Sequence, residues 1–189
     1  MIKEKAIKYG LFLCVLGIVV GVLLSVVNAI TKPVIENFEK EKVQALLNEY
    51  NSDYDWSDCD ITDTIPDLNP QILNVYAGKV DGIEVVRVYK VQTTGYSSGA
   101  IVSMIYIENN TIMKVSLVSL QSQTKGVGSK IEDESYLKVY EGKKCSEYKN
   151  DLAQNHNSKS VDVISGATIS SRGVISAVII ACNEHLSGE

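Results

Sequence analysis

Asp162-Val163-Ile164-Ser165-Gly166-Ala167-Thr168 leads directly into Ile169-Ser170-Ser171 and an apolar helical pattern. These residues combine hydroxyl groups and small side chains with an expected helix N-terminus. Such a terminus exposes unpaired backbone N–H groups and the positive end of the helix dipole, so it suits a phosphate group. Gly166 and Ala167 would let the phosphate approach the main chain, with Thr168 beside it.

The same residues also have a purely structural interpretation. Ser165, Thr168 or Ser170 can serve as an ordinary N-cap for the helix that follows, which is the commoner use of such residues. Local physical chemistry alone favours this cap. The phosphate and cap interpretations therefore both stay open on these residues.

The segment after the motif predicts a closing helix from about Ser171 to His185. Its apolar residues recur at helical spacing and define one face that belongs in a core. The residues of this face are Val174, Ile175, Val178, Ile179, Cys182 and Leu186.

The region before the motif predicts an antiparallel sheet. Four segments alternate with period two and are rich in β-branched and aromatic residues. Asp81-Gly82 and Asn109-Asn110 are turn signals at two of their junctions, so a meander is the economical arrangement. With a further short helix expected in Glu132–Gly142, the fold class is α+β, an antiparallel sheet packed with helices. The predicted strands are Ile72–Tyr76, Ile83–Val91, Ala100–Ile107 and Thr111–Leu120.

The N-terminal region predicts a single transmembrane helix. No residue from Tyr9 to Ile30 carries a charge, and as a helix this stretch would be about 33 Å long, enough to cross the hydrocarbon core. A cleaved signal peptide is the alternative, because Met1–Lys8 is basic and Val27-Asn28-Ala29 resembles a cleavage site. The apolar stretch is longer than a usual signal-peptide core, so we expect a retained anchor.

Charges near the span bear on orientation. Lys3, Lys5 and Lys8 on one side are matched in number by three lysines on the other, but the N-terminal lysines lie closer to the membrane and the free amino group adds to them. We therefore expect a cytoplasmic N-terminus and an extracytoplasmic domain.

Small residues recur every four positions within the span, at Gly17, Gly21, Ser25 and Ala29. This strip would let another membrane helix approach closely, or it reflects only the frequency of glycine in membrane helices. Both interpretations stay open.

The chain divides into three expected regions. Residues 1–31 form the cytoplasmic tip and transmembrane helix. Residues 32–70 form a juxtamembrane helix, Lys32–Tyr50, followed by an acidic surface loop. Residues 71–189 form the folded domain.

Composition excludes several functions. The net charge of −5 and the lack of a basic run argue against nucleic-acid binding. Cys14, Cys59, Cys145 and Cys182 lack the spacing of a metal site, so no metal is expected. Cys59 and Cys145 could pair outside the cytoplasm. The two histidines, His156 and His185, are expected to face solvent.

No set of residues in the sequence forms a recognisable catalytic site of its own, either as a nucleophile with its base or as a phosphate-binding loop with lysine. One loop is nevertheless suited to a ligand. In Gln121–Lys130, Gly126 and Gly128 permit tight backbone geometry close to a bound group.

A resemblance favours the phosphate interpretation. Asp162, Ser165, Gly166, Ala167 and Thr168 resemble the D-x-x-[ST]-G-A-T signature of the FMN-binding domain family. Its members include the G subunit of the Rnf electron-transport complex and the C subunit of the sodium-pumping NADH:quinone reductase. In that family a separate flavin transferase joins the last Thr to the FMN phosphate by a phosphoester bond. The resemblance assigns this attachment to Thr168, assigns phosphate accommodation to Ser165–Ala167, and connects Asp162 with the transferase.

A second resemblance concerns the glycine loop. Thr124, Gly126 and Gly128 match the family motif E-T-P-G-L-G, which lies against the flavin, whereas Gln123, Lys125 and Val127 depart from it. The resemblance therefore implies that Thr124, Gly126 and Gly128 line the flavin. Gly95-Tyr96, followed by Gly99, is similar to a glycine-rich stretch of the family that precedes its central hairpin.

These resemblances imply an electron-transfer subunit with covalent FMN in a bacterial or archaeal cell membrane, most like the Rnf G subunit. Its partners would be the other membrane and peripheral subunits of a ferredoxin:NAD complex that transports an ion, the flavin transferase, and membrane lipid. The alternatives are the sodium-pump C subunit, a lone membrane-anchored flavoprotein, and a membrane-anchored binding or sensory domain without a cofactor.

Overall fold

The computed structural model of this chain describes residues 2–121, 123, 126–148 and 163–188. The chain forms two units, Met1–Gln44 and Ala45–Glu189. The α+β class predicted from the sequence is confirmed by a long apolar N-terminal helix and a four-stranded antiparallel sheet with helices.

Helix α1 runs from Ile2 to Tyr50 and continues through Pro33. The segment expected as a separate helix over Lys32–Tyr50 is therefore part of the same helix. By length and composition, α1 is the one helix in the described part of the chain that could cross a membrane, and its most apolar stretch has no buried residues.

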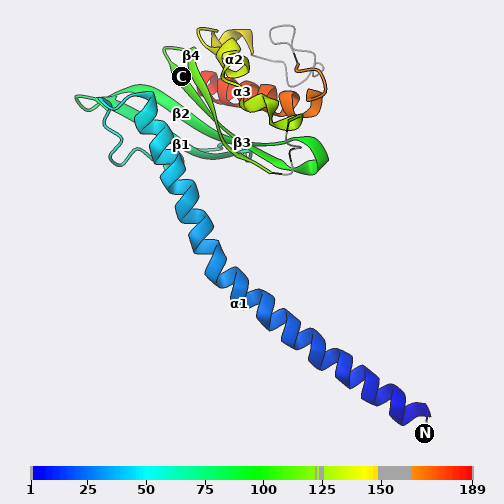
Figure 1. Cartoon of the computed structure of the whole chain (residues 1–189). Helices are drawn as coiled ribbons and strands as arrows, with labels where there is room; N and C mark the ends of the chain where they lie inside the picture. The colour runs from blue at the N-terminus through cyan, green and yellow to red at the C-terminus, as the bar shows by residue number, and fades with distance from the viewer. Residues whose placement is uncertain (1, 122, 124–125, 149–162, 189) are drawn as a thin grey trace. The chain divides into compact units, whose positions relative to one another are not determined.

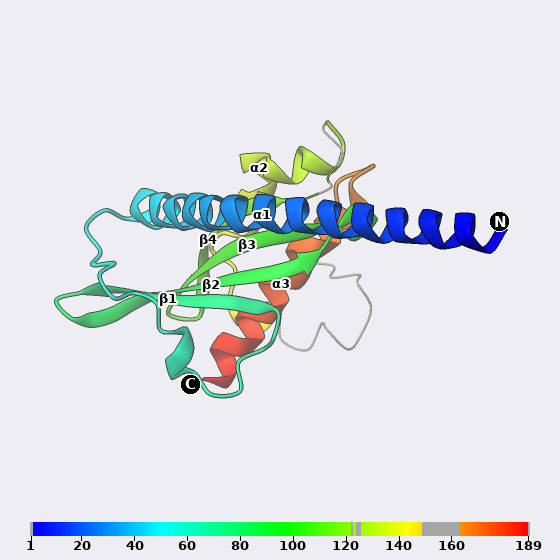
Figure 2. The same ribbon diagram turned by 90° about the horizontal axis from the view of Figure 1, so that it is seen from below.

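The sheet consists of β1 (Ile72–Val80), β2 (Ile83–Thr94), β3 (Ala100–Glu108) and β4 (Thr111–Leu120). The strands lie side by side in chain order, and each pairs antiparallel with the next, as Figures 1 and 2 show. The predicted meander is thus confirmed.

Two of the connections are two-residue turns with positive φ at both positions. The φ angles are 51° and 80° at Asp81-Gly82, and 46° and 62° at Asn109-Asn110. Such turns match the right-handed twist of paired strands, and Asn, Asp and Gly tolerate this conformation best. The turn residues therefore set the hairpin register.

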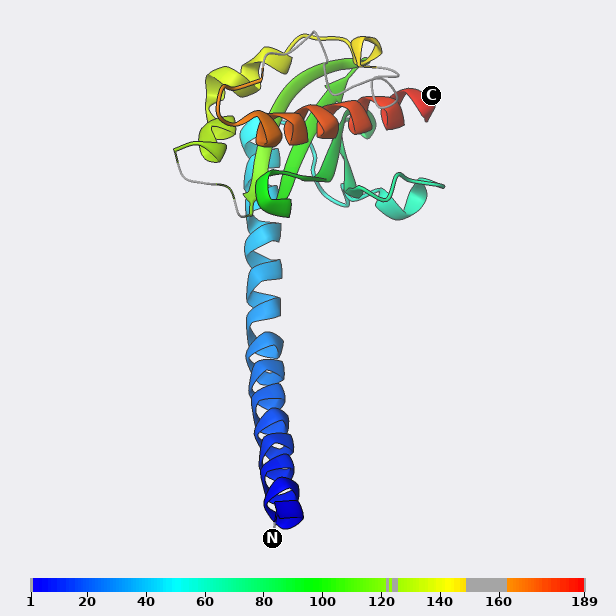
Figure 3. The ribbon, with the colours of Figure 1, turned by 90° about the vertical axis from the view of Figure 1, so that its right-hand side faces the viewer.

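Helix α3 (Thr168–Ser187) crosses one face of the sheet (Figure 3). It begins three residues earlier than expected. The predicted apolar face is confirmed, because Val174, Val178 and Cys182 are completely buried in one cluster with Ile101 and Ile105 of β3. This packing fixes where the first turn of α3 lies relative to the sheet.

The other face of β3 is also covered. The Tyr106 hydroxyl donates to the carbonyl of Leu46 at 3.2 Å, and the rings of Tyr50 and Tyr106 stack with centroids 4.6 Å apart. Tyr50 and Tyr54 both donate to Glu108 Oε1, at 2.6 and 3.1 Å. Because β3 is buried on both sides, its sequence is a nearly continuous apolar run rather than a clean alternation.

The acidic segment after α1 is largely irregular, as expected, with one short turn, η1 (Thr62–Thr64). It does not lie free of the domain, however. Asp55 and Asp60 form bridges with β1, and the buried indole of Trp56 covers Gly78, where an added Cβ would lie 2.8 Å from the ring. The segment thereby covers the outer edge of β1.

The remaining elements are short. The helix expected within Glu132–Gly142 is α2 (Glu134–Leu137), which continues into η4 (Lys138–Tyr140). The other short turns are η2 (Tyr96–Ser98), η3 (Gly128–Glu132) and η5 (Cys145–Glu147).

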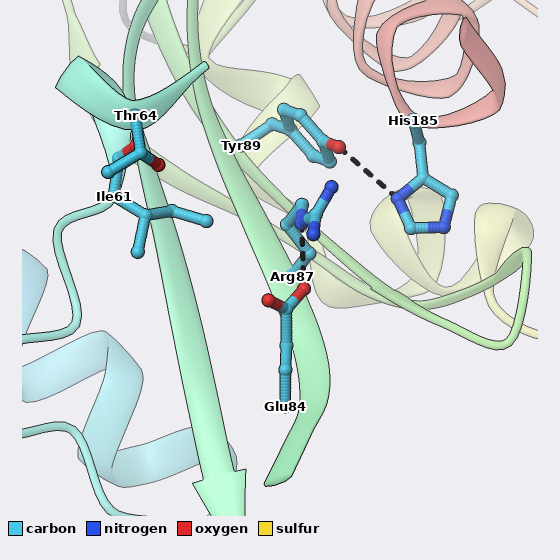
Figure 4. Close-up of polar contacts among 6 residues, drawn as sticks. All are labelled: Ile61, Thr64, Glu84, Arg87, Tyr89 and His185. Carbon is cyan, nitrogen blue, oxygen red and sulfur yellow. Dashed lines mark hydrogen bonds and ion pairs between the residues drawn. The ribbon is translucent and has the colours of Figure 1, made fainter. Parts of the chain in front are cut away.

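The prediction that His185 faces solvent is wrong. Its side chain is buried, and Nδ1 lies 3.2 Å from the hydroxyl of Tyr89, beside the ion pair of Arg87 and Glu84 (Figure 4). The reason is periodicity: residue 185 follows Cys182 by three positions and shares its inward face. His156 lies outside the described residues.

The cysteines are free in this structure, and Cys59 does not meet Cys145. The Cys59 carbonyl accepts from Ala77 of β1, whereas the Cys145 N–H donates to Asn110 next to β4. These edges are three strand spacings apart, about 14 Å, and a disulfide needs Cα atoms within about 7 Å. A hydrogen bond with Cys145, together with burial, instead raises the pKa of the Cys182 thiol.

The buried tyrosines predict a loss of stability at alkaline pH. Burial raises the pKa of Tyr89 to about 12, and it also raises those of Tyr76, Tyr106 and Tyr140. Unfolded tyrosines ionise near pH 10, so the stabilisation is intact below about pH 10 and is lost as pH rises through the folded pKa values. Tyr89 alone would lower the free energy of unfolding by about 2 kcal/mol by about pH 12.

The measurement is the free energy of unfolding from about pH 8 to about pH 12, combined with the ultraviolet absorbance of tyrosinate. Ionisation of all tyrosines near their ordinary pKa, with no loss of stability, would contradict the expected late titration.

Candidate functional site

A pocket of about 350 Å³ lies at the start of α3. Three segments that are far apart in the sequence line it: the turn η2, the loop that begins η3, and the loop and first turn of α3. Its volume lies at the lower end of the range for small-molecule sites. The lining residues are Tyr96, Val127, Gly128, Gly166, Ala167, Thr168, Ile169 and Ser170.

The approach to α3 is a tight turn that depends on glycine. The Ala167 N–H donates to the Ile164 carbonyl at 2.9 Å, and Gly166 between them has a φ of +82°. This left-handed conformation is unfavourable for residues with a Cβ. Gly166 therefore lets the chain reverse directly into the helix and leaves the first turn of α3 open to the pocket.

No side chain among the described residues caps the N-terminus of α3. Ala167 occupies the N-cap position, and no side chain makes a capping hydrogen bond there, so the N-cap interpretation of Ser165, Thr168 and Ser170 is wrong. The first backbone N–H groups of a helix have no carbonyl partner within it. The first turn also contains no acidic residue. These N–H groups, at Thr168–Ser170, are therefore suited to an anion.

The serines of this turn have other partners. Ser170 Oγ donates to Gln123 Oε1 at 2.5 Å, and Ser171 Oγ accepts from the Ile164 N–H at 3.2 Å. The first bond ties α3 to the chain that follows β4, and the second holds the preceding turn. Together they fix the geometry of the pocket wall.

The glycine loop after β4 packs closely on this wall. A Cβ on Gly128 would lie 3.1 Å from Gln123 Oε1 and 3.3 Å from Ser170 Oγ, closer than ordinary contacts. Gly126 has a φ of +77°, and its N–H donates to Ser129 Oγ at 2.9 Å. The fold thus brings the two motifs of the sequence together, and glycine at position 128 makes the close approach possible.

The predicted site residues fall into three groups. Gly128, Gly166, Ala167 and the half-buried Thr168 line the pocket. Ser165 and Gly126 are exposed in the adjoining loops and do not line it. Thr124 and Asp162 lie outside the described residues.

Other pocket residues were not predicted as ligand contacts. Tyr96 appeared only within a glycine-rich match, Val127 as a departure from a motif, and Ser170 as a possible cap. One of them, Ile169, could have been found from the sequence, because a large apolar side chain in the exposed first turn of a helix indicates a ligand contact.

The pocket chemistry fits a flavin nucleotide. Backbone donors and a hydroxyl lie at the helix end, and exposed apolar side chains of Tyr96, Val127 and Ile169 lie around them. This combination suits a ligand with an anionic end and a flat apolar ring. In the described part of the chain, no group of three or more His, Cys, Asp or Glu residues is arranged to hold a metal ion.

The bond between Gln123 and Ser170 can be tested by substitution. Replacing Gln123 with Ala removes the acceptor for Ser170 Oγ and the donor to the Gln121 carbonyl at 2.9 Å. We expect a loss of about 1 to 2 kcal/mol in the free energy of unfolding. Urea unfolding measures it.

Q123E is the matched control, because a carboxylate still accepts from Ser170. It should retain more stability than Q123A. Equal losses in both variants would show that the bond to Ser170 contributes nothing.

Two family comparisons agree with this geometry. The model of the FMN-binding domain matches residues 95–183, which include every residue that lines the pocket. The model of the RnfG N-terminal region matches residues 1–49, which form nearly all of α1. No curated protein matches the chain at a significant level.

Proposed function

Because this chain is an RnfG-like protein with an FMN-binding domain, we propose that Thr168 carries its FMN through a phosphoester bond. The protein is then the flavin-bearing electron-transfer subunit of an Rnf-type membrane complex, which exchanges electrons between ferredoxin and NAD while it transports an ion. The observation that carries this proposal is the position of Thr168 in the pocket, at the uncapped N-terminus of α3.

The groups of the pocket that lie nearest Thr168 have separate roles in this proposal. The N–H groups of the first α3 turn hold the negative charge of the phosphate. Gly166 and Gly128 have no side chains and so leave room for the phosphate beside the backbone. Thr168 supplies the oxygen of the ester: the Oγ–P bond replaces one P–O bond of the flavin donor, and the hydroxyl proton leaves with the displaced group.

The chain's own residues include no proposed general acid or base. When bound, FMN supplies the redox chemistry, while the protein supplies position and electrostatics. Attachment through the phosphate end leaves the isoalloxazine free to exchange electrons. Ser165 and Gly126 adjoin the pocket as supporting loop residues, and Thr124 and Asp162 belong to the two family motifs by resemblance.

The membrane arrangement follows from α1. A single-pass membrane protein is supported by the apolar helix and by the RnfG match. We assign residues 1–31 to the cytoplasmic tip and span, 32–70 to the connecting region and 71–189 to the flavin domain on the extracytoplasmic side. The other Rnf subunits, a flavin transferase and membrane lipid are the proposed partners.

The RnfG match also favours an Rnf-type subunit over the C subunit of the sodium pump. A binding or sensory domain without a cofactor is disfavoured by α3, because the hydroxyls of the motif do not cap the helix. They therefore lack the structural role that this alternative requires.

The test is the intact mass of the full-length protein, purified in detergent from cells with and without a flavin transferase. We expect the mass of one FMN, less one water, only when the transferase is present, and peptide mapping should locate it on Thr168. An unmodified chain in both samples would refute the proposal. Co-purification with membrane subunits that contain iron–sulfur clusters would support the assigned complex.

A further inference from the structure

Tyr96 lines the pocket from a different part of the fold than the attachment residue. It lies in η2, between β2 and β3, and its side chain is 51% exposed. Among the described residues its hydroxyl has no hydrogen-bond partner. A large aromatic side chain with one face in a pocket and half its surface in water is suited to contact with a ligand.

The turn that carries Tyr96 has an unusual backbone. Ser97 and Ser98 have φ angles of 53° and 59°, the left-handed region that residues with a Cβ seldom adopt. The turn is closed by bonds from the Gly95 N–H to the Gly99 carbonyl at 2.8 Å and from the Gly99 N–H to the Tyr96 carbonyl at 3.1 Å. Strained conformations of this kind persist where the surroundings determine them, often at ligand sites.

The start of this turn is fixed against the rest of the site. A Cβ on Gly95 would lie 2.6 Å from Ile101 Cδ1 and 2.7 Å from Gln123 Nε2. Gln123 is also the residue that accepts from Ser170 in the first turn of α3. The Gln123 side chain therefore lies close to the base of the Tyr96 turn and also bonds to the first turn of α3.

The apolar side chains that line the pocket are not covered by any other described part of the chain. Val127 and Ile169 also line it and are 42% and 51% exposed. Grouped apolar side chains around a pocket are typical of ligand sites. A flat ring next to the phosphate position would cover the side chains of Tyr96, Val127 and Ile169.

We infer that Tyr96 packs its ring against the isoalloxazine of the flavin held at Thr168 and shields that face from water. This inference rests on the proposed attachment of FMN. Offset stacking of aromatic rings adds to the gain from simple burial. An adjacent phenol also quenches flavin fluorescence by donating an electron to the excited ring, whereas a phenyl ring does not.

The test compares full-length Tyr96→Phe and Tyr96→Leu with the unaltered protein, all produced with the flavin transferase. Ile83→Ala, at the β1–β2 turn and 71% exposed, is the control for loss of an exposed apolar side chain outside the pocket. Intact mass gives the flavin content. Fluorescence yield per flavin reports the phenol, and quenching by iodide reports access of solvent to the ring.

We expect the fluorescence yield to rise several-fold in both Tyr96 variants, because both lack the phenol. Iodide access should rise only in Tyr96→Leu. There the loss of stacking should lower the ratio of flavin rings packed in the pocket to rings exposed to solvent by about threefold to tenfold. Ile83→Ala should match the unaltered protein in both measurements.

The outcomes separate the inference from the proposed function. Full flavin content with unchanged fluorescence and iodide access in Tyr96→Leu would overturn the contact and leave the attachment intact. Absence of flavin from the unaltered protein would refute the attachment itself. Loss of flavin in Tyr96→Leu but not Tyr96→Phe, with circular dichroism unchanged in both, would support contact between an aromatic side chain at position 96 and the flavin ring.

Discussion

Replacing Thr168 with Ala will leave the full-length chain without covalent flavin while its domain still folds. The hydroxyl oxygen is the proposed ester atom, so its removal eliminates attachment rather than weakening it. Thr168 makes no capping hydrogen bond, and alanine favours helices, so the free energy of unfolding of the flavin-free proteins should differ by less than about 1 kcal/mol. Intact mass and thermal unfolding measure the two effects.

Two further variants serve as controls for Thr168→Ala. T168S keeps a hydroxyl at the same position and should carry flavin. T64A removes an exposed hydroxyl that donates to the Ile61 carbonyl at 2.6 Å, outside the pocket (Figure 4), and should also carry flavin. Full flavin content in Thr168→Ala would place the attachment elsewhere.

Replacing Gly173 with Val will displace α3 from the sheet and reduce both stability and flavin attachment. A Cβ at this position would lie 2.8 Å from Ile101 Cδ1 and 3.2 Å from the Thr94 carbonyl oxygen. The Gly173 carbonyl also accepts a hydrogen bond from Thr93 Oγ1 at 2.9 Å. Overpacking of this kind costs about 1 to 3 kcal/mol, since neither β2 nor the buried Ile101 can move freely.

Urea unfolding measures the stability loss, and intact mass measures the flavin content. Gly188→Val is the matched control, because a Cβ at the C-terminal end of α3 would have its nearest neighbour at 3.7 Å, an ordinary contact. It should change stability by less than about 0.5 kcal/mol. If Gly173→Val were as stable as this control, the close contact between α3 and β2 would not be needed to hold the site.

Sequence reasoning predicted the sheet well because local signals agreed with the global fold. The paired turn residues Asp81-Gly82 and Asn109-Asn110 specify two-residue hairpins, and the strands that flank them are rich in β-branched and aromatic residues. Predictions that depended on neighbours far away in the sequence fared less well. His185 has polar sequence neighbours, yet the helix turns it onto the sheet beside Tyr89.

The sequence by itself determined the antiparallel order of the strands, the apolar face of α3, and the one segment able to span a membrane. Each of these follows from periodicity, turn chemistry or length, which act over a few residues. Only the tertiary structure decided that no described side chain caps the helix that begins at Thr168 and that the loop around Gly128 lies against its first turn. Ser170 bonds to Gln123, which is 47 residues away in the chain, and local sequence cannot reveal a partner at that distance.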